Sequence, residues 1–240
     1  MNNFMNINFL FDKVKVYELI KQNQKGYICV VNANIVVNAN KNEDYKTIIN
    51  NSLFNICDGS IIASLYNKIN KKRISSYPGP DMFIEYINKK EFISAFIGSS
   101  EELLNSLKGE MVKIDKSIEN SLFYSPPFIK DVHHFNYKEI ASIINEKKPN
   151  IIWVALGAPK QEKFMSLLLP YLEEGIMIGV GAAFTFYSGQ KNLRRAPLWM
   201  RKAKLEWLFR IYLEPKKTLN RIRVEVFNLP ILIYREIRKK

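Results

Sequence analysis

The chain has 240 residues, 47% of them hydrophobic, with 36 lysines and arginines against 23 aspartates and glutamates. This length can bury a sizeable core and suits one domain with an appendage. No stretch reaches the roughly 18 to 20 apolar residues of a spanning helix, so we expect the protein to lie on a membrane rather than to cross it. The first 20 residues lack a signal-peptide pattern. Cys29 and Cys57 are expected to be buried thiols in a reduced, cytoplasmic setting.

Short β-rich runs alternate with segments of helical periodicity along the chain. This pattern is typical of an α/β protein whose mostly parallel sheet carries helices on both faces. The predicted strands are Tyr27–Val31, Leu53–Cys57, Phe92–Ile97, Ile151–Leu156 and Ile176–Val180. The predicted helices are Ile35–Asn50, Ser60–Asn70, Asp81–Lys89, Glu101–Leu107, Tyr137–Glu146 and Gln161–Leu172.

The last 50 residues, 191–240, differ from the rest in charge and aromatic content. They hold 15 lysines and arginines against 4 aspartates and glutamates, so +11 of the net charge of +13 lies here. We predict a core at 1–190 and an appendage at 191–240 with two or three helices, broken at Pro215 and Pro230. Because aromatic and apolar residues are interleaved with the charges, the appendage suits an anionic membrane surface better than nucleic acid.

Polar and glycine residues follow the predicted strands, at the edge where open α/β sheets bind ligands. Asp58 comes directly after one strand and before Gly59 and an apolar helix. Its carboxylate is placed either to cap that helix or to act as a general base beside a phosphate site. Only Asp58 and Asp81, of six aspartates, lie beside glycine-containing loops of the predicted sheet.

Two glycine loops offer further candidate ligand contacts. The segment Gly157–Glu162 places a glycine where backbone N–H groups can approach a phosphate, and then begins a helix. A plain strand-to-helix turn with Pro159 in the first turn accounts for it equally well. In Gly179–Phe184, small residues allow either close approach of a ligand or tight helix packing.

Metal and cofactor signatures are missing from the sequence. His133-His134 has no carboxylate or cysteine at ligand spacing, and the chain contains no Asp-x-Asp, P-loop or Gly-x-Gly-x-x-Gly motif. We therefore expect no metal and no cofactor, and we expect arginine to neutralise a leaving diphosphate.

Several motifs occur together in one order and spacing. They are Asn32-Ala33, Asp58-Gly59, Gly79-Pro80-Asp81, Ala155–Glu162, Gly179–Phe184, Ser188-Gly189 with Arg195-Ala196-Pro197, and Leu205–Arg210. Together they resemble the WecG/TagA/CpsF glycosyltransferases, family 26, over roughly residues 27–215.

The resemblance implies a Rossmann-like α/β core of the GT-E type with a C-terminal helical, membrane-docking appendage. It implies inverting, metal-independent transfer of a hexose or N-acetylhexosamine from a UDP-sugar to a lipid-diphosphate-linked saccharide, in cell-surface polysaccharide biosynthesis. The expected partners are the UDP-sugar, a polyprenyl-diphosphate-linked acceptor and an anionic membrane, without nucleic acid, and homo-oligomerisation is left open. The expected location is the cytoplasm, peripheral on the inner face of the cell membrane.

The resemblance also assigns roles to individual residues. The catalytic set is Asp58 as the base, with Arg210 and Arg221 reaching toward the diphosphate. The expected substrate and UDP contacts are Asn32, Gly59, Asp81, Gly157, Pro159, Lys160, Gln161, Glu162, Gly181 and Arg195.

Three departures from the family pattern bear on specificity. Val30 stands where a threonine is common, Thr185 where an aspartate is common, and Lys216-Lys217 where two arginines are common. Lysine keeps the charge but lacks the bidentate geometry of arginine. The alternative function is a non-catalytic nucleotide- or phospholipid-binding module that recruits partners to the membrane. RNA binding through the basic appendage is a third hypothesis, which steep salt dependence would support.

Overall fold

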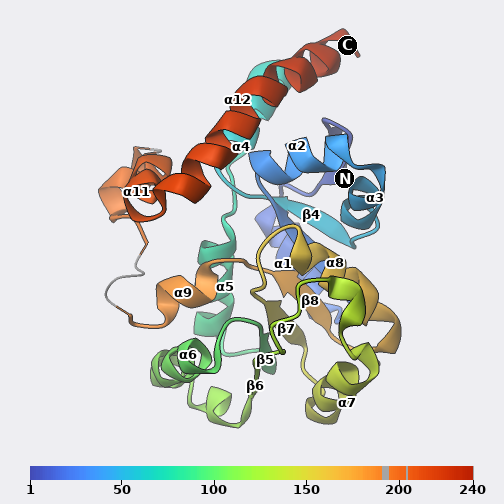
Figure 1. The fold of residues 1–240 in the computed structure, drawn as a ribbon, viewed down its shortest axis with the longest axis vertical. Helices are drawn as coiled ribbons and strands as arrows, with labels where there is room; N and C mark the ends of the chain where they lie inside the picture. The colour runs from blue at the N-terminus through green and yellow to red at the C-terminus, as the bar shows by residue number, and fades with distance from the viewer. Residues whose placement is uncertain (191–194, 204, 240) are drawn as a thin grey trace.

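The computed structural model describes residues 1–190, 195–203 and 205–239, which form a mixed α/β fold (Figure 1). Its sheet has eight strands in the order β1-β2-β4-β3-β8-β7-β5-β6. β1 and β2 pair antiparallel, and all other neighbouring strands are parallel, which confirms the mostly parallel sheet. The strands are β1 Asn2–Phe4, β2 Ile7–Phe9, β3 Gly26–Val31, β4 Phe54–Cys57, β5 Ser94–Ile97, β6 Leu122–Tyr124, β7 Ile151–Val154 and β8 Ile176–Gly179.

Helices cover both faces of the sheet, as predicted. Along β3, alternate side chains enter different clusters, with Cys29 and Val31 in one and Ile28 and Val30 in the other. The helices of the Cys29 face are α2 Ala33–Lys41, α3 Glu43–Asn50, α4 Ser60–Asn70, α7 Tyr137–Lys147 and α8 Lys160–Leu168. The helices of the Ile28 face are α1 Lys13–Lys21, α5 Gly79–Lys89, α6 Glu101–Ile114 and α9 Ala183–Tyr187. Short 3₁₀ turns lie at Lys116–Asn120, Val132–His134 and Leu169–Tyr171.

Some elements differ from the sequence prediction. The single helix expected over Ile35–Asn50 is two helices, α2 and α3, because Asn42 has an extended backbone and accepts a hydrogen bond from Tyr45 N at 2.8 Å. The strands β1, β2 and β6 and the helix α1 were not predicted. Each of these strands has only three residues, too few to display an alternating pattern.

The C-terminal region contains α10 Leu198–Lys202, α11 Glu206–Leu213 and α12 Pro215–Arg238. Within residues 195–203 and 205–239, three helices and a break before Pro215 agree with the prediction. The break expected at Pro230 is wrong, since α12 continues through it. Helix α12 packs on α2 (Figure 1). Its residues Leu229 and Leu232 are buried in the same core cluster as residues of α2, and this burial offsets the backbone hydrogen bond lost at Pro230. The predicted boundary at residue 191 lies outside the described residues.

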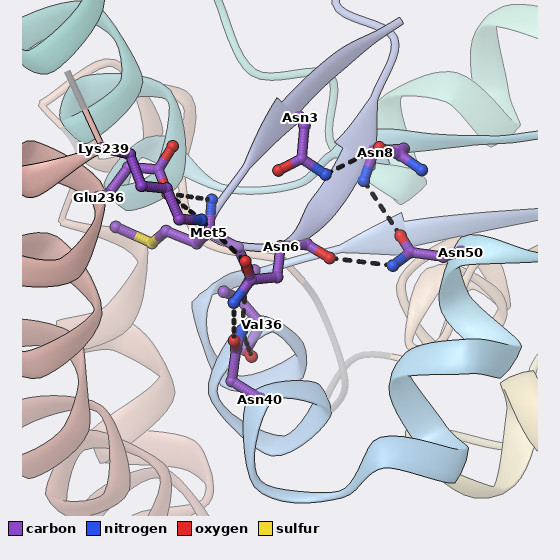
Figure 2. A network of polar contacts seen from close by, with 9 residues as sticks. All are labelled: Asn3, Met5, Asn6, Asn8, Val36, Asn40, Asn50, Glu236 and Lys239. Atoms are coloured by element: carbon purple, nitrogen blue, oxygen red, sulfur yellow. Dashed lines mark hydrogen bonds and ion pairs between the residues drawn. The ribbon is translucent and has the colours of Figure 1, made fainter.

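A polar clasp joins the end of α12 to the N-terminal hairpin (Figure 2). Glu236, which is buried, accepts a hydrogen bond from Met5 N at 3.1 Å and forms an ion pair with Lys239 at 3.2 Å. Lys239 also donates to Asn6 Oδ1 at 2.8 Å, and Asn40 of α2 donates to the Met5 carbonyl at 2.9 Å. The clasp therefore holds the hairpin turn between α2 and α12.

We expect Glu236→Ala to lower the free energy of unfolding by about 1–3 kcal/mol, because the Met5 N–H loses its buried acceptor. Urea unfolding measures this change. The matched control is Glu43→Ala, which breaks an exposed pair with Lys46 on α3 and should cost at most about 0.5 kcal/mol. Equal losses in the two variants would contradict a stabilising clasp.

Candidate active site

A cleft of about 410 Å³ opens at the carboxyl ends of β4, β3, β8 and β7. Four neighbouring parallel strands end there, so the loops that follow them meet at one edge. Helices α9, α11 and α12 close the other side. The lining includes Val30, Asn32, Asp58, Gly157, Gln161, Gly181, Thr185, Phe186, Arg210, Glu214 and Arg221. Val30 and Thr185, the two departures from the family pattern that lie within residues 1–190, are thus both in the cleft wall.

Asp58 reaches the cleft because the helix after β4 begins without it. Gly59, with φ +80°, occupies the N-cap position of α4, so the cap interpretation of Asp58 is wrong. Asn32 Oδ1 caps α2 by accepting from Ile35 N at 3.1 Å. The Asn32 side chain also hydrogen-bonds the Asp58 carboxylate, and its amide nitrogen is the donor that remains. The hydrogen bond from Asn32 therefore orients the Asp58 carboxylate, which remains available because it does not cap the helix.

Burial, aided by the nearby carboxylate of Glu206, raises the pKa of Asp58 to about 6. Arg195, the Asn32 hydrogen bond and Arg210 act in the opposite direction. The carboxylate is therefore ionised at neutral pH yet close enough to its pKa to accept a proton.

Two glycines keep the floor of the cleft open. Gly157 has φ +76° and Gly181 has φ +55°. Apart from the glycine and its two chain neighbours, no described residue has an atom within 4 Å of the Cβ that either position would carry. A side chain at either position would be strained and would enter the cleft. Backbone can therefore approach a ligand here.

The predicted Gly157–Glu162 contacts divide between the cleft and the protein interior. Gln161 lines the cleft, whereas Glu162 is fully buried behind it and accepts a hydrogen bond from Tyr45. Lys160 donates to the Ile129 carbonyl at 2.5 Å and lies over the ring of Phe135, outside the lining. Pro159, at the N-cap of α8, also lies outside it.

The predicted catalytic arginines both line the cleft. Arg210 lies over the ring of Phe186 with its guanidinium carbon 4.5 Å from the ring centroid, and its Nη1 atom lies 3.6 Å from Glu214 Oε2. Arg221 reaches the cleft from α12. Burial lowers the pKa of Arg210, but a guanidinium stays charged in proteins. Sequence reasoning missed Phe186, because nothing in the sequence distinguishes it from any other aromatic residue on a short helix.

Arg195 and Asp81, which were expected to contact substrate, bind each other outside the cleft lining. Arg195 forms a bidentate pair with the Asp81 carboxylate, and its Nε donates to Glu206 Oε1 at 3.2 Å. Arg201 lies 3.6 Å from the same Asp81. This cluster fastens α11 to the start of α5 and places Glu206 near Asp58. Sequence reasoning missed Glu206, because a glutamate in a helix is explained equally well by a position on its exposed face, without any functional role.

A cleft at the carboxyl ends of parallel strands, lined by a carboxylate and two arginines, is a candidate active site. The family model for the glycosyl transferase WecG/TagA/CpsF family matches residues 7–240. The chain belongs to this family and is a glycosyltransferase, which confirms the resemblance drawn from the motifs. None of the helices within 1–190, 195–203 and 205–239 combines the length and apolar character needed to cross a bilayer.

The chain is also similar to three bacterial proteins that share one name, N-acetylglucosaminyldiphosphoundecaprenol N-acetyl-beta-D-mannosaminyltransferase. The protein from Bacillus subtilis (strain 168) is 29% identical, over 89% of this chain and 81% of that one. The protein from Bacillus spizizenii is 27% identical, over 82% and 75%. The protein from Staphylococcus aureus (strain NCTC 8325) is 23% identical, over 96% and 87%.

Proposed function

We propose that the protein transfers an N-acetylhexosamine from a UDP-sugar to a polyprenyl-diphosphate-linked saccharide used for a cell-wall polymer. The names of the relatives make N-acetylmannosamine the first donor sugar to test and N-acetylglucosamine the first acceptor sugar. One observation carries the proposal: Asp58, held by Asn32, shares a single cleft with Arg210 and Arg221.

In the proposed mechanism Asp58 accepts the proton of an acceptor hydroxyl as that oxygen attacks the anomeric carbon. The bond from this carbon to the UDP oxygen breaks on the opposite face, so the configuration inverts. The two electrons of that bond leave with UDP, and Arg210 and Arg221 stabilise the growing charge without a metal ion. Gly157 and Gly181 give the diphosphate room to approach the backbone.

A direct experiment offers UDP-sugars and a short-chain lipid-diphosphate acceptor to the full-length protein. Mass spectrometry and NMR then identify the product and its anomeric configuration. Transfer with inversion supports the proposal. UDP binding without transfer or donor hydrolysis would favour the alternative, a non-catalytic recruitment module.

The pH profile tests Asp58 as the base. We expect kcat/KM to rise with pH through about 6 and to fall about tenfold for each unit below it, because only the ionised carboxylate accepts a proton. Initial rates between pH 5 and 8 measure the profile. A rate that stays constant across this range would exclude Asp58 as the titrating base.

We further propose that the appendage 191–240 docks peripherally on the anionic, cytoplasmic face of the membrane. Large apolar side chains are exposed on all three C-terminal helices, among them Trp199, Trp207, Phe227, Ile231 and Tyr234. Basic side chains lie on the same helices. Each basic residue contributes about 1 kcal/mol near anionic lipid, and a buried aromatic side chain about 1.5–3 kcal/mol.

Phe227→Glu is expected to weaken binding to phosphatidylglycerol-containing vesicles about tenfold or more, since it replaces an exposed apolar contact with a repelled charge. Flotation measures the bound fraction. The matched control is Phe128→Glu, which alters an almost fully exposed phenylalanine outside the appendage. Equal flotation of the two variants would refute docking through α12.

A further inference from the structure

A chain of hydrogen bonds runs behind the cleft wall and joins three elements. Tyr45 of α3 donates its hydroxyl to Glu162 Oε2 at 2.9 Å, and Gln161 Nε2 donates to Glu162 Oε1 at 3.1 Å. Gln161 Oε1 accepts from Gly181 N at 3.0 Å. The chain thus connects α3, through the first turn of α8, to the turn after β8.

The donor and acceptor roles in these hydrogen bonds restrict how the Gln161 side chain can be oriented. A backbone N–H can only donate, so Gly181 requires the oxygen of the Gln161 amide. The amide nitrogen must then face Glu162, whose two carboxyl oxygens accept from Gln161 and Tyr45. The donor and acceptor pattern therefore fixes which way the Gln161 amide points.

The links are buried, and Glu162 is separated from any ligand in the cleft. Glu162 is 0% exposed, Gln161 3% and Tyr45 3%. Burying a carboxylate is costly unless donors satisfy its oxygens, and here each oxygen has one. Because Glu162 lies behind the lining, its effect on a ligand must pass through Gln161.

The turn held by this chain forms part of the cleft wall. The Gly181 N–H already donates to Gln161. Gly181 therefore contributes to ligand binding through the open space beside its α-carbon rather than through its N–H group. A Cβ on Gly179 would collide with the Gln161 amide nitrogen, which shows how closely the amide supports the wall. A shift of the amide would therefore move the wall.

We propose that Tyr45 and Glu162 are positioning residues for the nucleoside diphosphate of the donor. They lock the Gln161 amide, which holds the Gly179–Gly181 turn at the spacing that admits the diphosphate beside the backbone. This inference rests on the proposed function and adds to it a residue on α3 that does not touch the cleft.

Calorimetric titration with UDP tests the proposal on Tyr45→Phe. We expect UDP to bind about tenfold more weakly, a change in affinity that corresponds to the loss of about one hydrogen bond. The matched control is Tyr137→Phe, which removes another buried hydroxyl, donated to the Val132 carbonyl at 2.6 Å, from a ring that packs on Phe164 of the same helix α8. The control should keep its UDP affinity. Equal affinities in the two variants would overturn the proposal, even if both lose thermal stability.

Two variants of Glu162 separate hydrogen bonding from packing. Glu162→Gln keeps the chain, since its oxygen can accept from Gln161 while its nitrogen donates to the Tyr45 hydroxyl, so UDP affinity should stay within about threefold. Glu162→Met fills similar space without an acceptor, and UDP binding should weaken about tenfold or more.

Hydrogen exchange of the Gly181 amide, followed by NMR, gives a measurement independent of UDP. The amide should exchange faster in Glu162→Met than in wild type, and at the wild-type rate in Glu162→Gln. Unchanged exchange in Glu162→Met would overturn the positioning role itself. A wild-type protein that binds no UDP would instead overturn the proposed function.

Discussion

Asp58→Asn should lower kcat about 10²–10⁴-fold at pH 7.5, the usual contribution of a general base. The asparagine retains an oxygen that can accept from the Asn32 side chain, so the cleft should keep its shape. UDP affinity is expected to stay within about twofold. Steady-state transfer assays and calorimetry measure the two quantities on the same preparation. Near wild-type turnover would remove Asp58 from the mechanism.

The same substitution should stabilise the folded protein at neutral pH. The pKa of Asp58 is raised in the folded state, so below pH 3.8 both states are protonated and burial of the carboxyl carries no charge penalty. The penalty grows as pH rises and is complete above about 6. A neutral amide avoids this penalty, which predicts a gain of about 1–3 kcal/mol in the free energy of unfolding at pH 8 and little gain at pH 4. A gain that is independent of pH would contradict the raised pKa.

Arg210→Met should lower kcat about 10²–10³-fold, the effect of removing one charged donor from a developing negative charge. Arg210 is held over Phe186 and beside Glu214, so its position is fixed before substrate arrives. Methionine retains much of the side-chain length and removes the charge. The loss should exceed the change in UDP affinity, because the diphosphate gains charge as the donor bond breaks.

Arg223→Met is the matched control for Arg210→Met. Arg223 lies on α12 outside the cleft lining, so its loss should change kcat less than about twofold in detergent solution with a short-chain acceptor. Equal losses in the two variants would show that the total charge of the appendage matters, rather than the position of Arg210.

The paired residues explain why part of the candidate site escaped sequence reasoning. Glu162 was expected in the UDP contacts, yet its partner is Tyr45, 117 positions away. Arg195 was expected beside the diphosphate, yet it pairs with Asp81 at a separation of 114. The pattern of residues along the chain cannot show which side chain, distant in sequence, will pair with a given charged group in the folded protein.

The sequence by itself determined the alternation of strands and helices, the position of Asn32 and Asp58 at strand ends, and the family. These follow from local causes, since apolar runs, glycines and caps act within a few residues. Only the tertiary structure decided that α12 continues through Pro230, that Glu162 faces α3 and that Arg210 rests on Phe186. Burial decided these features, because the packing of remote elements sets which polar groups lose water and must find a partner.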